Sequence, residues 1–260
     1  MARIVFGMQP VREAIRRHGA AVERVLVAAG QARVDALERF AADQGIRVQR
    51  VSGDHLDRLA HGGKHQNVAA YAPELHLYKL DELRPVEDSP LLVLDGITDP
   101  QNFGASIRSA IALGSGAVLW AEHGSAPLTA ATFRASAGAV EHARLFLVPS
   151  LRTAIVKLGE QGMRSVALDP AAPGTLAELD LRGSVAIVVG AEDEGVSRGV
   201  RRACTYQARL PMTSKVQSLN ASVAAAVALY EVARQRQERA LPSNAQLEAV
   251  RAPKGEQKMD

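Results

Sequence analysis

The stretch DGITDPQNFGASIR, residues 95–108, carries three residues whose types and spacing could form part of a ligand site. Asn102, Gly104 and Arg108 form the pattern N-x-G-x-x-x-R, directly after a run of apolar residues. Gly104 would allow a close backbone approach at the start of a helix, and that end of a helix attracts anions. Our hypothesis is a pocket with Asn102 at its mouth and Arg108 on the first turns of the helix. The alternative is a capping Asn and a solvated Arg.

A second stretch, IVVGAEDEGVSRGV at residues 187–200, places Gly190, Glu192 and Gly195 in the pattern G-x-E-x-x-G. A glycine-rich turn after a buried strand lets a flat ligand lie against bare backbone. The run is not a Walker loop because no Gly-Lys-Ser/Thr follows, and its carboxylates make it a poor phosphate site. The alternative is a surface turn that is solvated by its acidic side chains.

A third stretch, LPMTSKVQSLNASVAAAVALYE at residues 210–231, joins the end of one strand to the start of a helix. Ser218 and Asn220 stand at that helix start, where either could instead act only as an N-cap. The helix that follows is rich in Ala and Val, which suits a tightly packed core or a subunit interface.

The elements that must position these three loops alternate between apolar strands and helices from Pro90 onward. Near-continuous apolar strands predict an α/β fold with a parallel sheet that is covered on both faces. Ligands of such sheets bind at the carboxyl ends of the strands, where all three loops lie. We expect strands at residues 91–96, 117–122, 144–149, 164–169, 184–190 and 206–211, and helices at residues 104–114, 129–141, 151–162, 196–204 and 220–240.

The sequence pattern divides the chain into four segments. Residues 1–75 predict a small α/β unit, residues 76–89 a linker rich in charge and proline, and residues 90–240 the larger domain. Residues 241–260 have little apolar content and are expected to form a frayed tail. In the small unit we expect strands at residues 3–7, 22–29, 46–52 and 66–73, and helices at residues 8–19, 32–45 and 52–60.

Composition narrows the class of protein. The 260 residues carry a formal charge of +3, which only weakly suggests a polyanionic partner. Arginine outnumbers lysine, which suits phosphate recognition, although a compositional bias of the genome is the preferred explanation of that excess. No apolar run approaches the roughly 18 residues of a membrane span, and no secretory signal is recognisable, so we expect no membrane association. A single cysteine, Cys204, excludes an internal disulfide, suits a cytoplasmic protein and leaves no basis for a cysteine metal site.

The three stretches occur in the order of the motifs of the SPOUT-class RNA 2′-O-methyltransferases, and the chain resembles this family. The likeness is to the branch that includes the tRNA and 23S rRNA guanosine methyltransferases. Upstream, IVFGMQPVREAI and HQNVAAYA resemble the start and the end of the small RNA-binding domain that precedes the catalytic domain in the rRNA enzymes. That domain is similar to the ribosomal L30/L7Ae fold, and the whole resemblance covers about residues 3–240.

The resemblance implies a SPOUT α/β domain that ends in a trefoil knot, binds S-adenosyl-L-methionine (AdoMet) and forms a homodimer through the knot region. AdoMet would lie against Gly190, Leu210 and Leu219, with Met212 nearby. The implied reaction is methylation of a guanosine ribose 2′-hydroxyl in 23S rRNA, free or in a large-subunit assembly intermediate. A tRNA substrate and a non-catalytic RNA-binding relative are the alternatives. A nucleotide-binding enzyme is disfavoured because the lone G-x-G at residues 113–117 lacks a third glycine.

Arg108 matches the catalytic arginine of the family. The polar residues that match its expected surroundings are Asn102, Glu192, Ser218 and Asn220. Two roles for Arg108 stay open: a base assisted by an RNA phosphate, or a cation that stabilises the developing alkoxide and clamps a phosphate. The first role is demanding because arginine stays protonated up to roughly pH 12. Arg198, Arg201 and Arg202 form either an RNA-facing patch or a solvated helix face.

Overall fold

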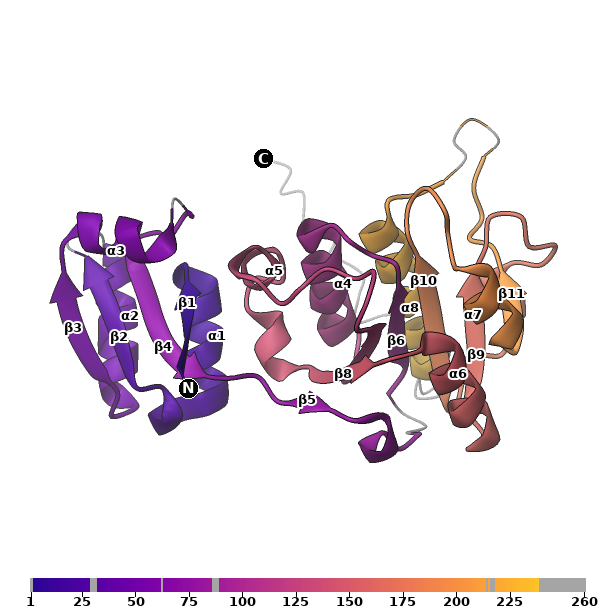
Figure 1. The fold of residues 1–260 in the computed structure, drawn as a ribbon, viewed down its shortest axis with the longest axis horizontal. Coiled ribbons are helices and arrows are strands. Elements are labelled where there is room, and N and C mark those ends of the chain that lie inside the picture. The colour runs from indigo at the N-terminus through magenta and orange to yellow at the C-terminus, as the bar shows by residue number, and fades with distance from the viewer. Residues whose placement is uncertain are drawn as a thin grey trace, which may run out of the picture.

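The computed structural model describes residues 2–28, 32–61, 63–85, 89–213, 215 and 218–238. These residues form two α/β units with separate sheets, joined by an extended segment (Figure 1). The expected tail at residues 241–260 lies outside the described residues. None of the helices in the described ranges combines the length and the hydropathy that a bilayer crossing requires.

The N-terminal unit is a four-stranded sheet with the strand order β1-β4-β2-β3. Its elements are β1 (Ala2–Phe6), α1 (Met8–His18), β2 (Arg24–Ala28), α2 (Ala32–Asp43), β3 (Arg47–Val51), α3 (Gly53–Ala60) and β4 (Val68–Pro73). Strand β4 pairs antiparallel with β1 and β2, whereas β3 pairs parallel with β2. Val11, Ala14 and Ile15 give α1 a buried face at helical spacing, so α1 packs with α2 on one face of the sheet. Leu56 of α3 packs on the other face.

The C-terminal unit is a seven-stranded sheet with the order β11-β9-β10-β6-β7-β8-β5, and all of its pairings are parallel. Its strands are β5 (Leu77–Tyr78), β6 (Leu91–Asp95), β7 (Ala117–Ala121), β8 (Arg144–Val148), β9 (Arg164–Leu168), β10 (Val185–Gly190) and β11 (Tyr206–Ala208). Its helices are α4 (Pro100–Ala112), α5 (Ala130–Ala135), α6 (Leu151–Glu160), α7 (Arg198–Ala203) and α8 (Ala221–Glu238). The prediction of an α/β fold with a parallel sheet is therefore confirmed.

Helices cover both faces of the larger sheet, which explains its apolar strands. Successive residues of a strand point to opposite faces. Leu92 and Leu94 of β6 accordingly pack in the core with α4 and α8, whereas Leu91 and Val93 pack in the core with α6 and α7. The central strands are therefore apolar at nearly every position, and polar chemistry is found mainly at their carboxyl ends.

Helix α4 begins four residues earlier than the predicted start at residue 104. The Asp99 carboxylate accepts hydrogen bonds from the backbone N–H groups of Gln101 and Asn102, both at 3.1 Å. Pro100 occupies the first helical turn. Backbone N–H groups of the first turn have no acceptor within the helix, so the missing N–H of proline costs no hydrogen bond there. The Asp-Pro pair is thus an N-cap and a helix start rather than a loop, and it places Asn102 in the first turn of α4.

Two further segments differ from the expected elements. In the predicted linker, residues 76–89, Leu77 and Tyr78 form strand β5 and pair with β8 at the edge of the larger sheet. The single helix expected at residues 129–141 is broken after α5, because Ala137 and Gly138 adopt positive φ angles of 50° and 83°. A short 3₁₀ helix, η3 (Ala139–His142), follows the break.

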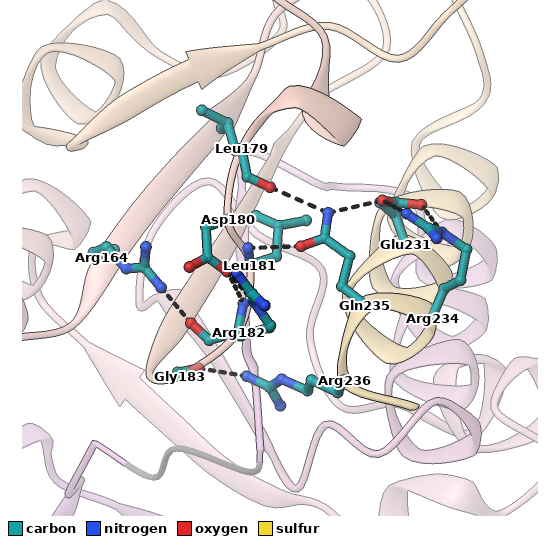
Figure 2. A network of polar contacts seen from close by, with 10 residues as sticks. All are labelled: Arg164, Leu179, Asp180, Leu181, Arg182, Gly183, Glu231, Arg234, Gln235 and Arg236. Atoms are coloured by element: carbon teal, nitrogen blue, oxygen red, sulfur yellow. Dashed lines mark hydrogen bonds and ion pairs between the residues drawn. The ribbon is translucent and has the colours of Figure 1, made fainter. Parts of the chain in front are cut away.

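Polar contacts fix the C-terminal end of α8 to the loop that precedes β10 (Figure 2). The Gln235 side chain accepts from the Leu181 N–H at 2.9 Å and donates to the Leu179 carbonyl at 3.1 Å. The Arg236 guanidinium donates to the Gly183 carbonyl at 2.6 Å. These contacts satisfy backbone groups of the loop and hold the C-terminal end of α8 against it.

Candidate active site

Side chains from all three predicted loops meet in one hydrogen-bonded cluster. Asn102 Nδ2 donates to Glu192 Oε1 at 2.8 Å. Asn220 Nδ2 lies 2.8 Å from Asn102 Oδ1 and 2.5 Å from Glu192 Oε1. The second carboxylate oxygen, Glu192 Oε2, has no hydrogen bond to another residue in the described part of the chain. One oxygen of Glu192 is thus saturated by amides, and the other is available as an acceptor.

Strand geometry explains why these loops coincide. Strands β6 and β10 are parallel neighbours, with Gly190 in register with Asp95, so both loops leave the same edge of the sheet. The Asp95 carboxylate accepts from the Ser197 N–H at 2.7 Å and ties the second loop back to β6. At the third loop, Asn220 caps α8, because its Oδ1 accepts from the Ser222 N–H at 2.9 Å. The expected N-cap and the expected site residue are therefore the same side chain.

Gly190 marks a place where two backbone segments touch. A Cβ atom on Gly190 would lie 1.9 Å from the Gly195 carbonyl carbon and 2.1 Å from the Val196 nitrogen. The turn between them is closed by a hydrogen bond of 2.9 Å from the Gly195 N–H to the Ala191 carbonyl, and Gly195 has a φ of +65°. Both glycines of the G-x-E-x-x-G pattern are thus required by backbone geometry.

A cavity opens beside this turn, at the carboxyl ends of β9 and β10. The four predicted cofactor positions, Gly190, Leu210, Met212 and Leu219, all line it. Glu192 and Ser218 line it as well, whereas the cavity wall is otherwise mostly apolar. An apolar slot with a few polar groups is the usual form of a site for a flat, partly polar ligand.

Asp169, at the carboxyl end of β9, also lines the cavity and was not predicted from the sequence. Its Oδ2 pairs with Arg201 Nη1 at 2.7 Å, and its Oδ1 accepts from the Ala171 N–H at 2.9 Å. These contacts hold the carboxylate at the cavity wall. The sequence signal at this position is a lone acid directly after an apolar strand, a pattern that is too common to identify a site residue.

Arg201 thereby acquires a partner inside the larger domain. Of the three arginines suggested as an RNA-facing patch, Arg201 is half-buried and paired with Asp169, whereas Arg198 and Arg202 are exposed. The three side chains therefore do not act as one free basic surface.

Gly104 has a different role from the predicted one. It lies inside α4 rather than at its start, because the helix begins at Pro100. A Cβ atom there would lie 2.5 Å from the Thr132 carbonyl oxygen and 2.7 Å from Ala135 Cβ. Gly104 is thus needed for the close packing of α4 against α5, and the predicted approach of an anion to its backbone is wrong.

Arg108 does not join the cluster around Glu192. It makes no hydrogen bond or ion pair with another described residue, and it lines a second cavity together with Gln9 and Glu13 of α1. Six helical residues turn a side chain by about 600°, which leaves Arg108 on a different face of α4 from Asn102. The expectation that Asn102 and Arg108 open into one pocket is therefore wrong for the single chain.

Comparison with known proteins assigns the family. Residues 89–230 match the model of the SpoU rRNA Methylase family, and residues 4–78 match a model described as RNA 2'-O ribose methyltransferase substrate binding. The chain belongs to the SpoU rRNA methylase family. The predicted resemblance to SPOUT-class RNA 2′-O-methyltransferases is confirmed, and with it the prediction of an enzyme of this class.

Members of the SpoU family resemble this chain over most of its length. The 23S rRNA (guanosine-2'-O-)-methyltransferase RlmB of Xylella fastidiosa (strain 9a5c) is 38% identical over 89% of this chain and 96% of its own. A crystal structure of an RNA 2'-O ribose methyltransferase has a TM-score of 0.76 at 32% identity, covering 91% of this chain and 89% of that one. The SpoU methyltransferase AviRb of Streptomyces viridochromogenes, in complex with AdoMet, has a TM-score of 0.75 at 26% identity, covering 91% of each chain.

Proposed function

We propose that this SpoU family member transfers a methyl group from AdoMet to a ribose 2′-hydroxyl of a guanosine in 23S rRNA. Three observations support this activity: the family, a relative of 38% identity named for this reaction, and a match to a substrate-binding model over residues 4–78. The proposed site of action is the cytoplasm, as expected for a chain with a single cysteine. The observation that carries the proposal is that Asn102, Glu192 and Asn220 meet beside the apolar cavity.

The residues of the cavity fit AdoMet. The apolar side chains of Leu210 and Leu219 suit the faces of an adenine ring, and Gly190 allows the turn that forms one wall of the cavity to close tightly on itself. The Asp169 carboxylate can accept hydrogen bonds from ribose hydroxyl groups. When bound, AdoMet supplies a methyl group on a positively charged sulfur.

Glu192 is the acceptor for the target hydroxyl. Asn102 and Asn220 occupy its Oε1, which leaves Oε2 to receive the hydrogen bond of the 2′-hydroxyl and, as the new carbon–oxygen bond forms, its proton. The two amides also fix the orientation of the carboxylate, so that alignment supplies part of the rate enhancement. Ser218 lines the same cavity and can donate to the ribose or to the carboxylate.

Arg108 holds an RNA phosphate rather than acting as a base. Arginine is a poor general base, and Arg108 forms no ion pair with a carboxylate of the described residues. A guanidinium in that state binds a phosphate with two parallel hydrogen bonds, which explains why lysine would be a poor substitute. Arg108→Ala should abolish methyl transfer and leave AdoMet affinity near that of the wild type.

The proposal includes a homodimer and a trefoil knot. An exposed apolar stripe on α8, formed by Val223, Val227 and Tyr230 at helical spacing, supports a partner surface on that helix. The knot is proposed from the likeness to the SpoU family, whose model matches residues 89–230.

We further propose that the N-terminal unit, with its mixed four-stranded sheet, is an RNA-binding domain of the L30/L7Ae type.

The experiment is methyl transfer from labelled AdoMet to 23S rRNA and to tRNA, with the modified ribose located by mass spectrometry. We expect a single 2′-O-methylguanosine in 23S rRNA and none in tRNA. Glu192→Gln should bind AdoMet and transfer the methyl group at least about 100-fold more slowly. Methylation of tRNA alone would replace the proposed substrate, and failure to bind AdoMet would favour a non-catalytic relative.

A further inference from the structure

The two units of the chain meet along a seam between α1 and the segment that follows α5 (Figure 1). Gly138, between α5 and η3, lies so close to α1 that a Cβ atom would be 2.9 Å from Pro10 Cα and 2.9 Å from Glu13 Cβ. A backbone-to-backbone approach of this kind requires two surfaces of fixed relative position. The N-terminal unit is therefore docked on the larger domain, in addition to being tethered by the segment that joins them.

A buried carboxylate lies at the centre of this seam. Glu141 of η3 has a side chain with no exposed surface, and its Oε2 contacts Arg3 Nη2 at 2.5 Å and His18 Nε2 at 2.9 Å. Both partners belong to the N-terminal unit. Arg3 is oriented further by a hydrogen bond of 2.7 Å to the Pro73 carbonyl and by the Phe133 ring, 4.8 Å from its guanidinium.

The buried charges of this cluster fix the position of the N-terminal unit relative to the larger domain. A carboxylate without exposed surface is stable as an ion only while its partners stay in place. Sliding or rotating the N-terminal unit would separate Glu141 from Arg3 and His18 and leave buried charges without partners. An apolar contact would tolerate such a shift, whereas this cluster allows one arrangement.

The arrangement that Glu141 fixes is one in which both units line the cavity of Arg108. Gln9 and Glu13 of α1 face that cavity from the N-terminal unit, whereas His142 faces it from η3. Glu13 is already engaged, by Arg16 Nη1 at 2.9 Å and His142 Nε2 at 3.0 Å, so it does not neutralise Arg108. An RNA strand held at Arg108 would therefore lie beside Gln9 and Glu13 of α1.

We propose that the seam is a binding site for one RNA segment, shared by α1 and Arg108, and that Glu141 is the positioning residue that holds its two walls in register. This inference rests on the proposed function, because it takes the ligand to be the RNA substrate. Glu141 acts through Arg3 and His18 and touches neither RNA nor AdoMet.

The test compares Glu141→Gln with Glu160→Gln, an exposed glutamate on α6 outside the seam. For Glu141→Gln we expect the KM for 23S rRNA, and the Kd of the RNA by filter binding, to rise about tenfold, because the buried pair is broken. The maximal rate at saturating RNA and the Kd for AdoMet should stay within about twofold of the wild type, because the chemistry is untouched. Glu160→Gln should leave the KM and Kd for RNA, the maximal rate and the Kd for AdoMet unchanged.

His18→Asn is the second variant, since it removes one partner of Glu141 and keeps Arg3, and it carries the test if Glu141→Gln does not fold. We expect it to raise the KM for RNA by about threefold and to broaden the distribution of distances between the two units in small-angle scattering. An RNA affinity unchanged in both variants would overturn the inference. Wild-type protein that binds 23S rRNA but does not methylate it would overturn only the proposed function.

Discussion

The cofactor cavity and the seam are two candidate binding regions built in opposite ways. The cavity is made within one domain, from backbone at Gly190 and apolar side chains at the ends of neighbouring parallel strands. The seam is made between two units, from charged side chains such as Arg108 and Glu141 that lie on helices. The site for a small, flat cofactor thus depends on the carboxyl ends of neighbouring strands. The site for a long polyanion depends on how the two units of the chain pack against each other.

The cavity and the seam also differ in which domain supplies the partners of their carboxylates. Near the cavity each carboxylate is held by groups of its own domain, as Glu192 is by Asn102 and Asn220. At the seam, Glu141 is held by groups of the other unit. Changes at Gly190 or Asp169 should therefore weaken the binding of AdoMet and spare that of RNA, whereas changes at Glu141 should weaken the binding of RNA and spare that of AdoMet. Four predictions test this separation, in order of decreasing effect.

Gly190→Ala should have the largest effect. The new methyl group would lie 1.9 Å from the Gly195 carbonyl carbon, so the turn must open and the cavity must deform. We expect AdoMet affinity to fall by more than about 100-fold in calorimetry, or the domain to misfold. Gly159→Ala in α6 is the matched control, since a Cβ there meets nothing within 4 Å and should add about 0.5–1 kcal/mol of stability. An AdoMet affinity equal to that of the wild type in Gly190→Ala would show that the cavity does not depend on the close contact between Gly190 and Gly195.

Asp169→Asn should have the next largest effect. A neutral amide at the cavity wall is a weaker acceptor for hydroxyl groups and loses the ion pair with Arg201, so the Kd for AdoMet should rise about tenfold. RNA binding should not change. Asp180→Asn is the control, because Asp180 pairs with Arg182 outside the cavity. Equal AdoMet affinities in the two variants would exclude Asp169 from the cofactor site.

Asn220→Ala should lower stability and activity together. Helix α8 loses the cap that accepts from the Ser222 N–H, which costs about 1 kcal/mol in urea unfolding. Glu192 loses one of its two amide partners, so methyl transfer should slow as well. Ser150→Ala removes the comparable cap of α6 and should cost similar stability with no change in rate. If both variants slowed methyl transfer equally, the cluster would matter only for folding.

Cys204 should show the smallest effect, because it lines neither the cofactor cavity nor the cavity of Arg108. Burial raises the pKa of its thiol to about 11, so at pH 8 few molecules carry the reactive thiolate. Alkylation should therefore be slow in the native protein, and equally slow in Glu141→Gln if the larger domain stays packed. Because the folded pKa is the higher one, its contribution to stability is complete below pH 9 and is lost as the pH rises toward 11. Fast alkylation at pH 8 would mean that α7 and β11 had separated.

Sequence reasoning was strongest where a local rule forces the structure. Apolar runs with flanking loops predicted the parallel strands, and G-x-E-x-x-G predicted a turn that only glycines can make. It failed at Gly104, because the Asp99–Pro100 helix start was taken for a loop. It also missed β5, since a pair of residues in a polar segment gives no periodic signal. Asp169 was missed because one acid after a strand is too common a pattern to single out.

By itself the sequence determined the family, the alternation of strands and helices, and the three loops that lie at the carboxyl ends of the strands. These features follow from short-range rules, because strand burial, helix capping and glycine geometry depend on neighbouring residues. Only the tertiary structure decided that Glu192 gathers Asn102 and Asn220, that Arg108 faces the seam, and that Glu141 is buried against Arg3 and His18. Residues such as Arg3 and Glu141 lie far apart in the chain, and contacts over such separations are set by how whole elements pack.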